Sequence, residues 1–173
     1  MDRSTHVLAV LLVVLGVFAV SAAAAGEAKK KTKGKFFEAS KNEAIIITSD
    51  RMELDRKKNT ITYQGNVVAV RGDATMRSET LTATYDSGMV HLKKVIAEGK
   101  VRVTQGGRVA TGVKAVFNSQ DNTISLVGNP SVRQGKNQIS GSRIILFINE
   151  DRVVVEGGAR RVKAVIFPED LGK

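Results

Sequence analysis

An all-β fold is predicted by three features of this sequence. Apolar and polar residues alternate with a period of two along most of residues 45–167, as in 61–64 (ITYQ) and 81–85 (LTATY). These runs consist mainly of Val, Ile, Thr, Tyr and Phe, which favour extended strands. Clusters of Asp, Asn, Ser and Gly separate the runs, for example at residues 86–88 and 118–122, and we find no helical spacing in this region.

The predicted strands recur as a unit of roughly 30 residues. Each unit opens with a small or acidic pair, passes a turn and reaches a Gly before a Val-rich strand. The turn anchors recur every 31 or 32 residues, at Asp55, Asp86, Asn118 and Asn149. The Gly anchors recur after 29 or 34 residues, at Gly65, Gly99, Gly128 and Gly157. About four such units are expected to stack, because none of them buries its apolar face alone.

The first 25 residues have the layout of a secretory signal. Residues 7–20 are apolar and uncharged, and the small residues 21–26 follow them. We expect cleavage after Ala25, although an uncleaved segment 7–25 would be barely long enough to span a bilayer. Residues 26–43 are then expected to form a flexible basic tail, residues 44–168 the β domain, and residues 169–173 a C-terminal tail.

Charge and cysteine content narrow the class of protein. The chain has a formal net charge of +10 and no Cys. The Lys-rich segment 26–35 carries +4, so about +6 remains on the rest of the exported chain, which favours an anionic ligand or surface. A chain without Cys has neither disulfides, thiolate metal sites nor the acylated Cys of a bacterial lipoprotein. Export without disulfides is consistent with a bacterial periplasm.

Enzymatic activity, a cofactor and a metal site are not expected. The sequence contains no P-loop, GxSxG or HExxH motif, and His91 is the only His beyond the signal. Asp50, Glu53 and Asp55 have the spacing of a paired-acid site, but later units place Ser, Gly or Asn there, as turn residues. The positive charge would suit nucleic acid, but stacking aromatics are sparse and the signal indicates export.

Residues 45–55 (IIITSDRMELD) and 63–70 (YQGNVVAV) resemble the OstA-type organic-solvent-tolerance domain, in the LptA/OstA-type family of periplasmic lipopolysaccharide transport proteins. The resemblance extends over essentially all of residues 44–168. It implies an open antiparallel β-jelly roll with a lipid-binding groove between two sheet faces. It implies a bridge that carries lipopolysaccharide from the inner to the outer membrane. It also implies head-to-tail stacking with further copies and with homologous jelly-roll domains of inner-membrane (LptC-like) and outer-membrane (LptD-like) components.

Strand parity selects candidate groove residues, because Ile47 and Ile46 must face opposite sides of a strand. The candidates are mostly aliphatic: Ile45, Ile47, Leu54, Ile61, Tyr63, Leu81, Ala83, Tyr85, Val101, Val103, Phe117, Ile124, Leu126, Leu146 and Ile148. Such a lining suits acyl chains, at about 0.8 kcal/mol for each buried CH₂ group. The same alternation is also the pattern of an ordinary dry core, and a bulge at a Gly anchor would reverse the assignment of a strand.

The first and last predicted strands are expected to be open edges of the sheet. Neither contains an internal Pro, and residues 45–49 are uncharged, so both lack much of the usual protection against edge pairing. The candidate assembly residues are Ile45, Ile46, Ile47, Thr48, Ser49, Arg161, Val162, Lys163, Ala164, Val165, Ile166 and Phe167. Two alternatives remain: an LptC-like membrane-anchored component of the same pathway, and a polymerising β-solenoid scaffold.

Overall fold

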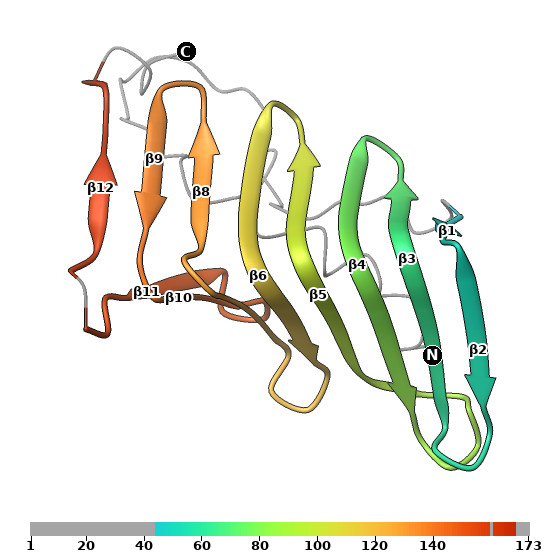
Figure 1. The fold of residues 1–173 in the computed structure, drawn as a ribbon. Helices are drawn as coiled ribbons and strands as arrows, with labels where there is room; N and C mark the ends of the chain where they lie inside the picture. The colour runs from blue at the N-terminus through green and yellow to red at the C-terminus, as the bar shows by residue number, and fades with distance from the viewer. Residues whose placement is uncertain (1–43, 160, 169–173) are drawn as a thin grey trace, which may run out of the picture.

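The computed structural model describes residues 44–159 and 161–168, in which twelve strands form one antiparallel sheet (Figure 1). The all-β, open antiparallel architecture expected from the sequence is confirmed. The predicted signal (1–25), the basic tail (26–43) and the C-terminal tail (169–173) lie outside the described residues.

Four long strands cross the whole sheet: β3 (Thr60–Arg71), β4 (Ala74–Tyr85), β5 (Leu92–Gln105) and β6 (Arg108–Asn118). The others are short and continue one another in pairs: β1 (Ile46–Thr48) with β2 (Arg51–Asp55), β7 (Thr123–Val127) with β8 (Ser131–Gln134), β9 (Asn137–Ser140) with β10 (Arg143–Phe147), and β11 (Arg152–Glu156) with β12 (Lys163–Val165). Each of the eight resulting chain paths pairs with the next one in sequence. This sequential antiparallel pairing is not that of a β-solenoid, so the solenoid alternative is wrong.

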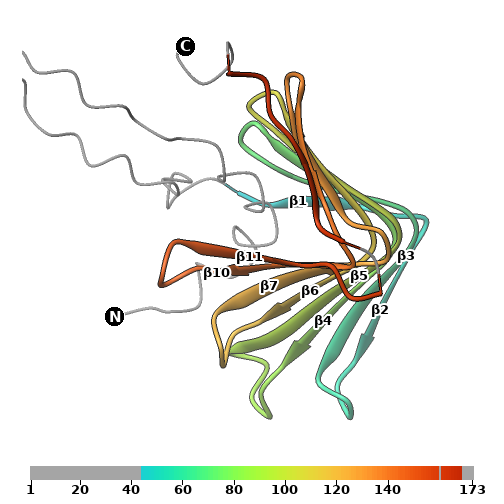
Figure 2. The same ribbon diagram turned by 90° about the vertical axis from the view of Figure 1, so that its left-hand side faces the viewer.

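The sheet is bent across its middle into two half-sheets that diverge from a common line (Figure 2). Half-sheet A contains β2, β7, β10, β11 and residues 60–64, 80–85, 92–98 and 114–118. Half-sheet B contains β1, β8, β9, β12 and residues 67–71, 74–78, 101–105 and 108–112. Each neighbouring pair among β3 to β6 has a register shift on the line between the two, and β4 and β5 have a second one at Thr84/Tyr85, away from this line. Because bulges bend strands, this row of irregularities produces the bend.

The bend line is built from residues that recur in the sequence. Gly65 and Gly99 have φ values of +76 and +81, in the left-handed region that favours glycine. The backbone N–H of Asp50 donates to the carbonyl oxygen of Gly65 at 3.0 Å. Asn66 Nδ2 donates to the Asp50 carboxylate at 2.9 Å. The acidic position of one chain path therefore meets the Gly anchor of the next, which gives a physical reason for the recurrence of both.

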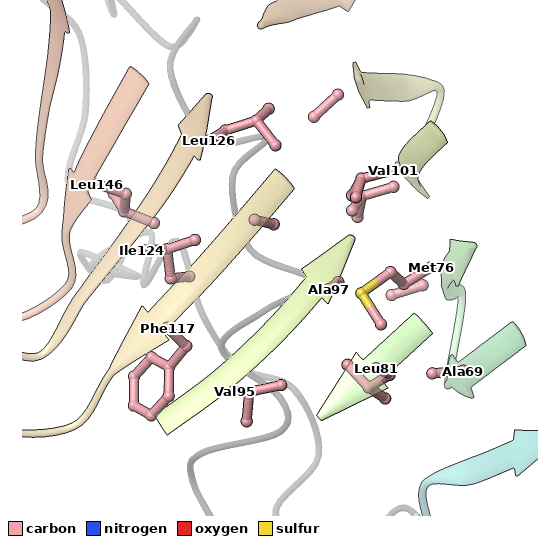
Figure 3. Close-up of a cluster of buried hydrophobic side chains, with 14 of the residues drawn as sticks. Ala69, Met76, Leu81, Val95, Ala97, Val101, Phe117, Ile124, Leu126 and Leu146 are labelled. Atoms are coloured by element: carbon pink, nitrogen blue, oxygen red, sulfur yellow. The ribbon is translucent and has the colours of Figure 1, made fainter. Parts of the chain in front are cut away.

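The apolar core lies on the inner faces of the two half-sheets, where side chains from successive strands meet (Figure 3). In half-sheet A, the strand register aligns one row of Ile61, Ala83, Val95, Phe117, Ile124 and Leu146. In half-sheet B, it aligns Ile47, Ala69, Met76, Val103, Ala110 and Val132. Each row runs across the strands, so the apolar surface extends along the sheet from one edge towards the other.

Replacing Gly65 with Ala is expected to destabilise the protein more than replacing Gly107 with Ala. The two glycines have nearly the same φ, +76 and +75, but an added Cβ at Gly65 would collide with the Asp50 side chain, whereas Gly107 has nothing within 4 Å. The left-handed conformation alone should lower the free energy of unfolding by about 1 kcal/mol in Gly107→Ala, and the collision by about 1–3 kcal/mol more in Gly65→Ala. Urea unfolding measures both; equal losses would contradict a structural role for the Asp50–Gly65 contact.

Candidate functional site: the apolar interior

The structure brings most of the groove candidates into one apolar interior between the half-sheets. Ile47, Tyr63, Tyr85 and Ile148 are partly buried and pack against the central cluster, and Ile45 and Ile61 are also half-buried. Leu54 shares the row of Ile61 but is 47% exposed, because it lies on the edge strand β2. The remaining candidates are at most 4% exposed: Leu81, Ala83, Val101, Val103, Phe117, Ile124, Leu126 and Leu146.

Several interior residues were not among the predicted groove residues. They are Val67, Ala69, Ala74, Met76, Leu92, Val95, Ala97, Ala110, Ala115, Val132 and Ile144, all buried. Met76 and Leu81 both face inward on β4 although one is even-numbered and the other odd, because the register shifts between Arg77 and Thr80. The inward-facing residues of β4 therefore change from even-numbered to odd-numbered at the bend. This change occurs at the acidic position of the repeat, whereas the sequence predicted such changes at the Gly positions. Ile144 has the same parity as Leu146 and could have been found.

The two free rims of the interior differ in chemistry. At the rim of half-sheet A, the cluster ends in Leu92 and the half-buried Tyr85 and Ile148. Burial raises the pKa of Tyr85 above 10.0, and Tyr63 raises it further, so this hydroxyl is neutral at ordinary pH. This rim is thus apolar and aromatic.

The rim of half-sheet B is polar and cationic. Arg71 is 5% exposed and lies two residues beyond the buried Ala69 on the same strand. Arg108 is paired in register with Gln134, and its Nε donates to Gln134 Oε1 at 3.1 Å. Asn137, 3% exposed, accepts a hydrogen bond from the Phe167 backbone N–H at 2.7 Å. On this side the apolar interior ends in guanidinium and amide groups.

The candidate acidic residues serve local structure. Asp50 is bonded at the bend, the Glu53 carboxylate pairs with Arg51 at 2.9 Å, and Asp55 accepts the backbone N–H of Lys58 at 3.0 Å. Within residues 44–159 and 161–168, no group of three or more His, Asp or Glu side chains is arranged to hold a metal ion. In the same ranges, the structure contains no helix of the length and apolarity needed to cross a membrane.

His91 and Asp86 close the loop between β4 and β5. The Nδ1 of His91 lies 2.7 Å from Asp86 Oδ2, and Asp86 Oδ1 accepts the backbone N–H of Val90 at 3.0 Å and of Gly88 at 3.2 Å. The hydrogen bond from Val90, followed by that from His91, lowers the pKa of Asp86 to about 2. The imidazole therefore helps to hold a turn together.

A bent, unclosed antiparallel sheet with an apolar inner surface defines the open β-jelly-roll class. Within this class, the chain belongs to the family described as the LptA/LptD N-terminal-domain LPS transport proteins, whose sequence profile matches residues 46–152. The family is thus one of transport proteins rather than enzymes.

Individual relatives agree with this assignment. An uncharacterized protein of Rhizobium meliloti (strain 1021) is 24% identical over 163 residues, which cover 90% of this chain and 87% of that protein. The lipopolysaccharide export system protein LptA of Escherichia coli (strain K12) is 23% identical over 137 residues, 75% of this chain and 74% of LptA.

A solved structure has the same fold. It is the crystal structure of LptH, the LptA-homologous periplasmic component of the lipopolysaccharide transport device of Pseudomonas aeruginosa. The match has a TM-score of 0.61 at 22% identity, and covers 73% of this chain and 96% of that chain.

Asp86→Asn is expected to remove a pH-dependent part of the stability. Since the pKa of Asp86 falls from 3.8 to about 2 on folding, its contribution is fully present above pH 3.8 and is lost as the pH falls towards 2. Wild-type stability should therefore fall over this interval more steeply than that of Asp86→Asn, measured by urea unfolding at several pH values. Asp151→Asn, in another exposed turn, is the control and should follow the wild type. Parallel curves for all three proteins would contradict the assignment.

Proposed function

We propose that this protein binds lipopolysaccharide with its acyl chains between half-sheets A and B and carries it through the periplasm from the inner to the outer membrane, as part of a transport complex. The observation that carries this proposal is the continuous apolar row across half-sheet A. It runs in register from Leu54 on β2 through Ala83 and Phe117 to Val153 on β11. An acyl chain needs no directional partner, so such a row binds it equally well at successive positions.

The magnitude of apolar burial favours an open slide over a sealed pocket. Complete burial of a chain of about 12 carbons would contribute up to roughly 10 kcal/mol, at about 0.8 kcal/mol for each CH₂. An acyl chain held that firmly would leave slowly. Partial burial along an unclosed sheet keeps affinity while allowing onward movement.

The difference between the rims orients the ligand. Arg71 and Arg108 provide guanidinium groups at the rim of half-sheet B, and charge-assisted hydrogen bonds from Arg to phosphate are among the stronger polar contacts. The aromatic and aliphatic rim of half-sheet A offers no such group among Tyr85, Leu92 and Ile148. The phosphorylated head group is therefore proposed to lie at the rim of half-sheet B, with the acyl chains directed towards half-sheet A.

Head-to-tail assembly is supported by the free edges. Within the described residues, β1 and β2 pair only with β3, β11 only with β10, and β12 only with β9. Because eight chain paths alternate in direction, the last path of one copy is antiparallel to the first path of a copy in the same orientation. The edge formed by β11 and β12 is proposed to pair with β1 and β2 of another copy, or with an LptC-like or LptD-like domain, which would join their interiors into one path.

A photo-crosslinking side chain at Ile47 should capture purified lipopolysaccharide, whereas one at Ile46 should not. Ile47 packs against the apolar interior, and its neighbour Ile46 faces outward with 62% of its surface exposed. Phe117 and Val116 form a second inward and outward pair on β6. Covalent adducts are detected by immunoblotting. Equal labelling within both pairs would show that the ligand does not bind between the half-sheets.

Proline substitution at the C-terminal edge should separate assembly from folding. In an edge strand, the N–H groups of neighbouring residues point alternately towards the sheet and away from it. Of the two variants Ala164→Pro and Val165→Pro, one therefore removes a hydrogen bond to β9, and the other removes an N–H group that points outward. The variant that retains wild-type thermal stability should lose concentration-dependent association in sedimentation velocity. Association that persists in that variant would contradict pairing through β12.

A further inference from the structure

Charge is unevenly divided between the two half-sheets. Half-sheet B and its turns contain eight Arg or Lys residues and one acidic residue, counted over residues 46–48, 67–78, 101–112, 131–140 and 161–167. Half-sheet A and its turns contain nine basic and eight acidic residues, counted over residues 51–64, 80–98, 114–127 and 143–156. The positive charge of the β domain is therefore concentrated in half-sheet B.

Four of these basic side chains lie on the outer face of half-sheet B. Arg77 on β4 is directly opposite Arg102 on β5, and Arg133 on β8 and Lys163 on β12 extend the group towards the C-terminal edge. All four are exposed and alternate with residues of the interior side, as Arg77 does with Met76. The other strand residues of this face are polar or aliphatic and include no acid: Ile46, Thr48, Val68, Val70, Thr75, Thr104, Val109, Thr111, Ser131, Gln138, Ser140 and Val165.

This arrangement is unfavourable for the isolated protein. Like charges directly opposite each other in a sheet are destabilising, as Arg77 and Arg102 are here. The seven ion pairs identified between described residues lie in half-sheet A or at the bend, such as Lys114 with Glu98 at 2.8 Å, and none of them includes the four outer cations. The net charge of half-sheet A is thus nearly balanced, whereas the outer face of half-sheet B carries basic residues without acidic ones.

We propose that this outer face, defined by Arg77, Arg102, Arg133 and Lys163, docks on the surface of an anionic phospholipid bilayer. Arg side chains and the Ser and Thr hydroxyls between them are donors suited to phosphate oxygens. The cations are spread over strands from β4 to β12, which suits an extended layer of head groups better than a single small anion. Ile46, 62% exposed, and Val165, 36% exposed, lie at opposite edges of the same face and would enter the head-group region.

Other occupants match the face less well. The buried centre of a protein interface is usually enriched in aromatic residues and Met, whereas the strand residues of this face include neither. A second copy of the chain presents either a nearly neutral half-sheet A or an equally cationic half-sheet B. A bilayer carrying negative charge is the complementary surface.

The test is binding to vesicles of phosphatidylcholine with and without phosphatidylglycerol, measured by co-sedimentation of the full chain. One variant combines Arg77→Gln, Arg102→Gln, Arg133→Gln and Lys163→Gln. The control combines Arg56→Gln, Lys57→Gln, Lys93→Gln and Lys94→Gln, exposed residues of half-sheet A, and removes the same charge. The wild type should bind only vesicles with phosphatidylglycerol; the first variant should bind at least about tenfold more weakly, and the control within about twofold of wild type.

Equally weakened vesicle binding in the first variant and the control would show that only net charge matters. Unchanged vesicle binding by the first variant would show that the face serves a protein partner or none. Either result overturns the proposal. A third variant with Arg77→Lys, Arg102→Lys and Arg133→Lys keeps the charge and should bind like wild type, which separates loss of charge from a disturbed fold. Weak binding by this variant with a wild-type circular dichroism spectrum would also overturn it. Since no lipopolysaccharide is added, failure here leaves the proposed function unaffected.

Discussion

The close contact between a left-handed glycine on one chain path and the side chain facing it on the preceding path is the constraint on which this architecture depends. At Asp50 and Gly65 it takes the form of a backbone hydrogen bond of 3.0 Å and a side-chain bond to Asn66 of 2.9 Å. On the inner side of the bend, a Cβ at Gly112 would lie 2.8 Å from Leu126. Small residues are therefore required on both sides of the line. Without the bend, the twelve strands would form an extended sheet with one apolar face open to water.

The bend also separates two functions that a single sheet face could not combine. The inner faces of the half-sheets supply apolar area, while the outer faces are free to differ in charge. In half-sheet A, pairs such as Arg152 and Glu150, 2.7 Å apart, balance the surface charge. In half-sheet B, the basic residues lie both on the inner rim, at Arg71 and Arg108, and on the outer face. On the proposals above, one half-sheet holds acyl chains and the other interacts with phosphate groups on both of its faces.

The sequence predicted the all-β class and most of the interior, because strand alternation and turn residues are local signals. Its failures come from geometry that is not local. Met76 was missed because the parity of β4 reverses where the register shifts, and Leu54 is exposed because nothing pairs with β2 on its outer side within the described residues. The rim of half-sheet B was not identified either: Arg71 is far in sequence from Gln134 and Asn137, and the pairing of β3 to β9 brings them to one side of the interior.

A ligand-free protein with this interior must satisfy two opposing requirements. Its inner side chains, Phe117 and Leu81 among them, are almost fully buried, so a lipid chain cannot enter without displacing contacts that the half-sheets already make. Apolar contacts between side chains and those with an acyl chain remove similar area from water, so exchanging one for the other changes the free energy little. On the proposed function, the main cost of loading is then the separation of the half-sheets about the bend. The glycine contacts on that line would set how easily the interior opens, and the exposed strand edges would let an acyl chain leave sideways into the next domain instead of returning to water.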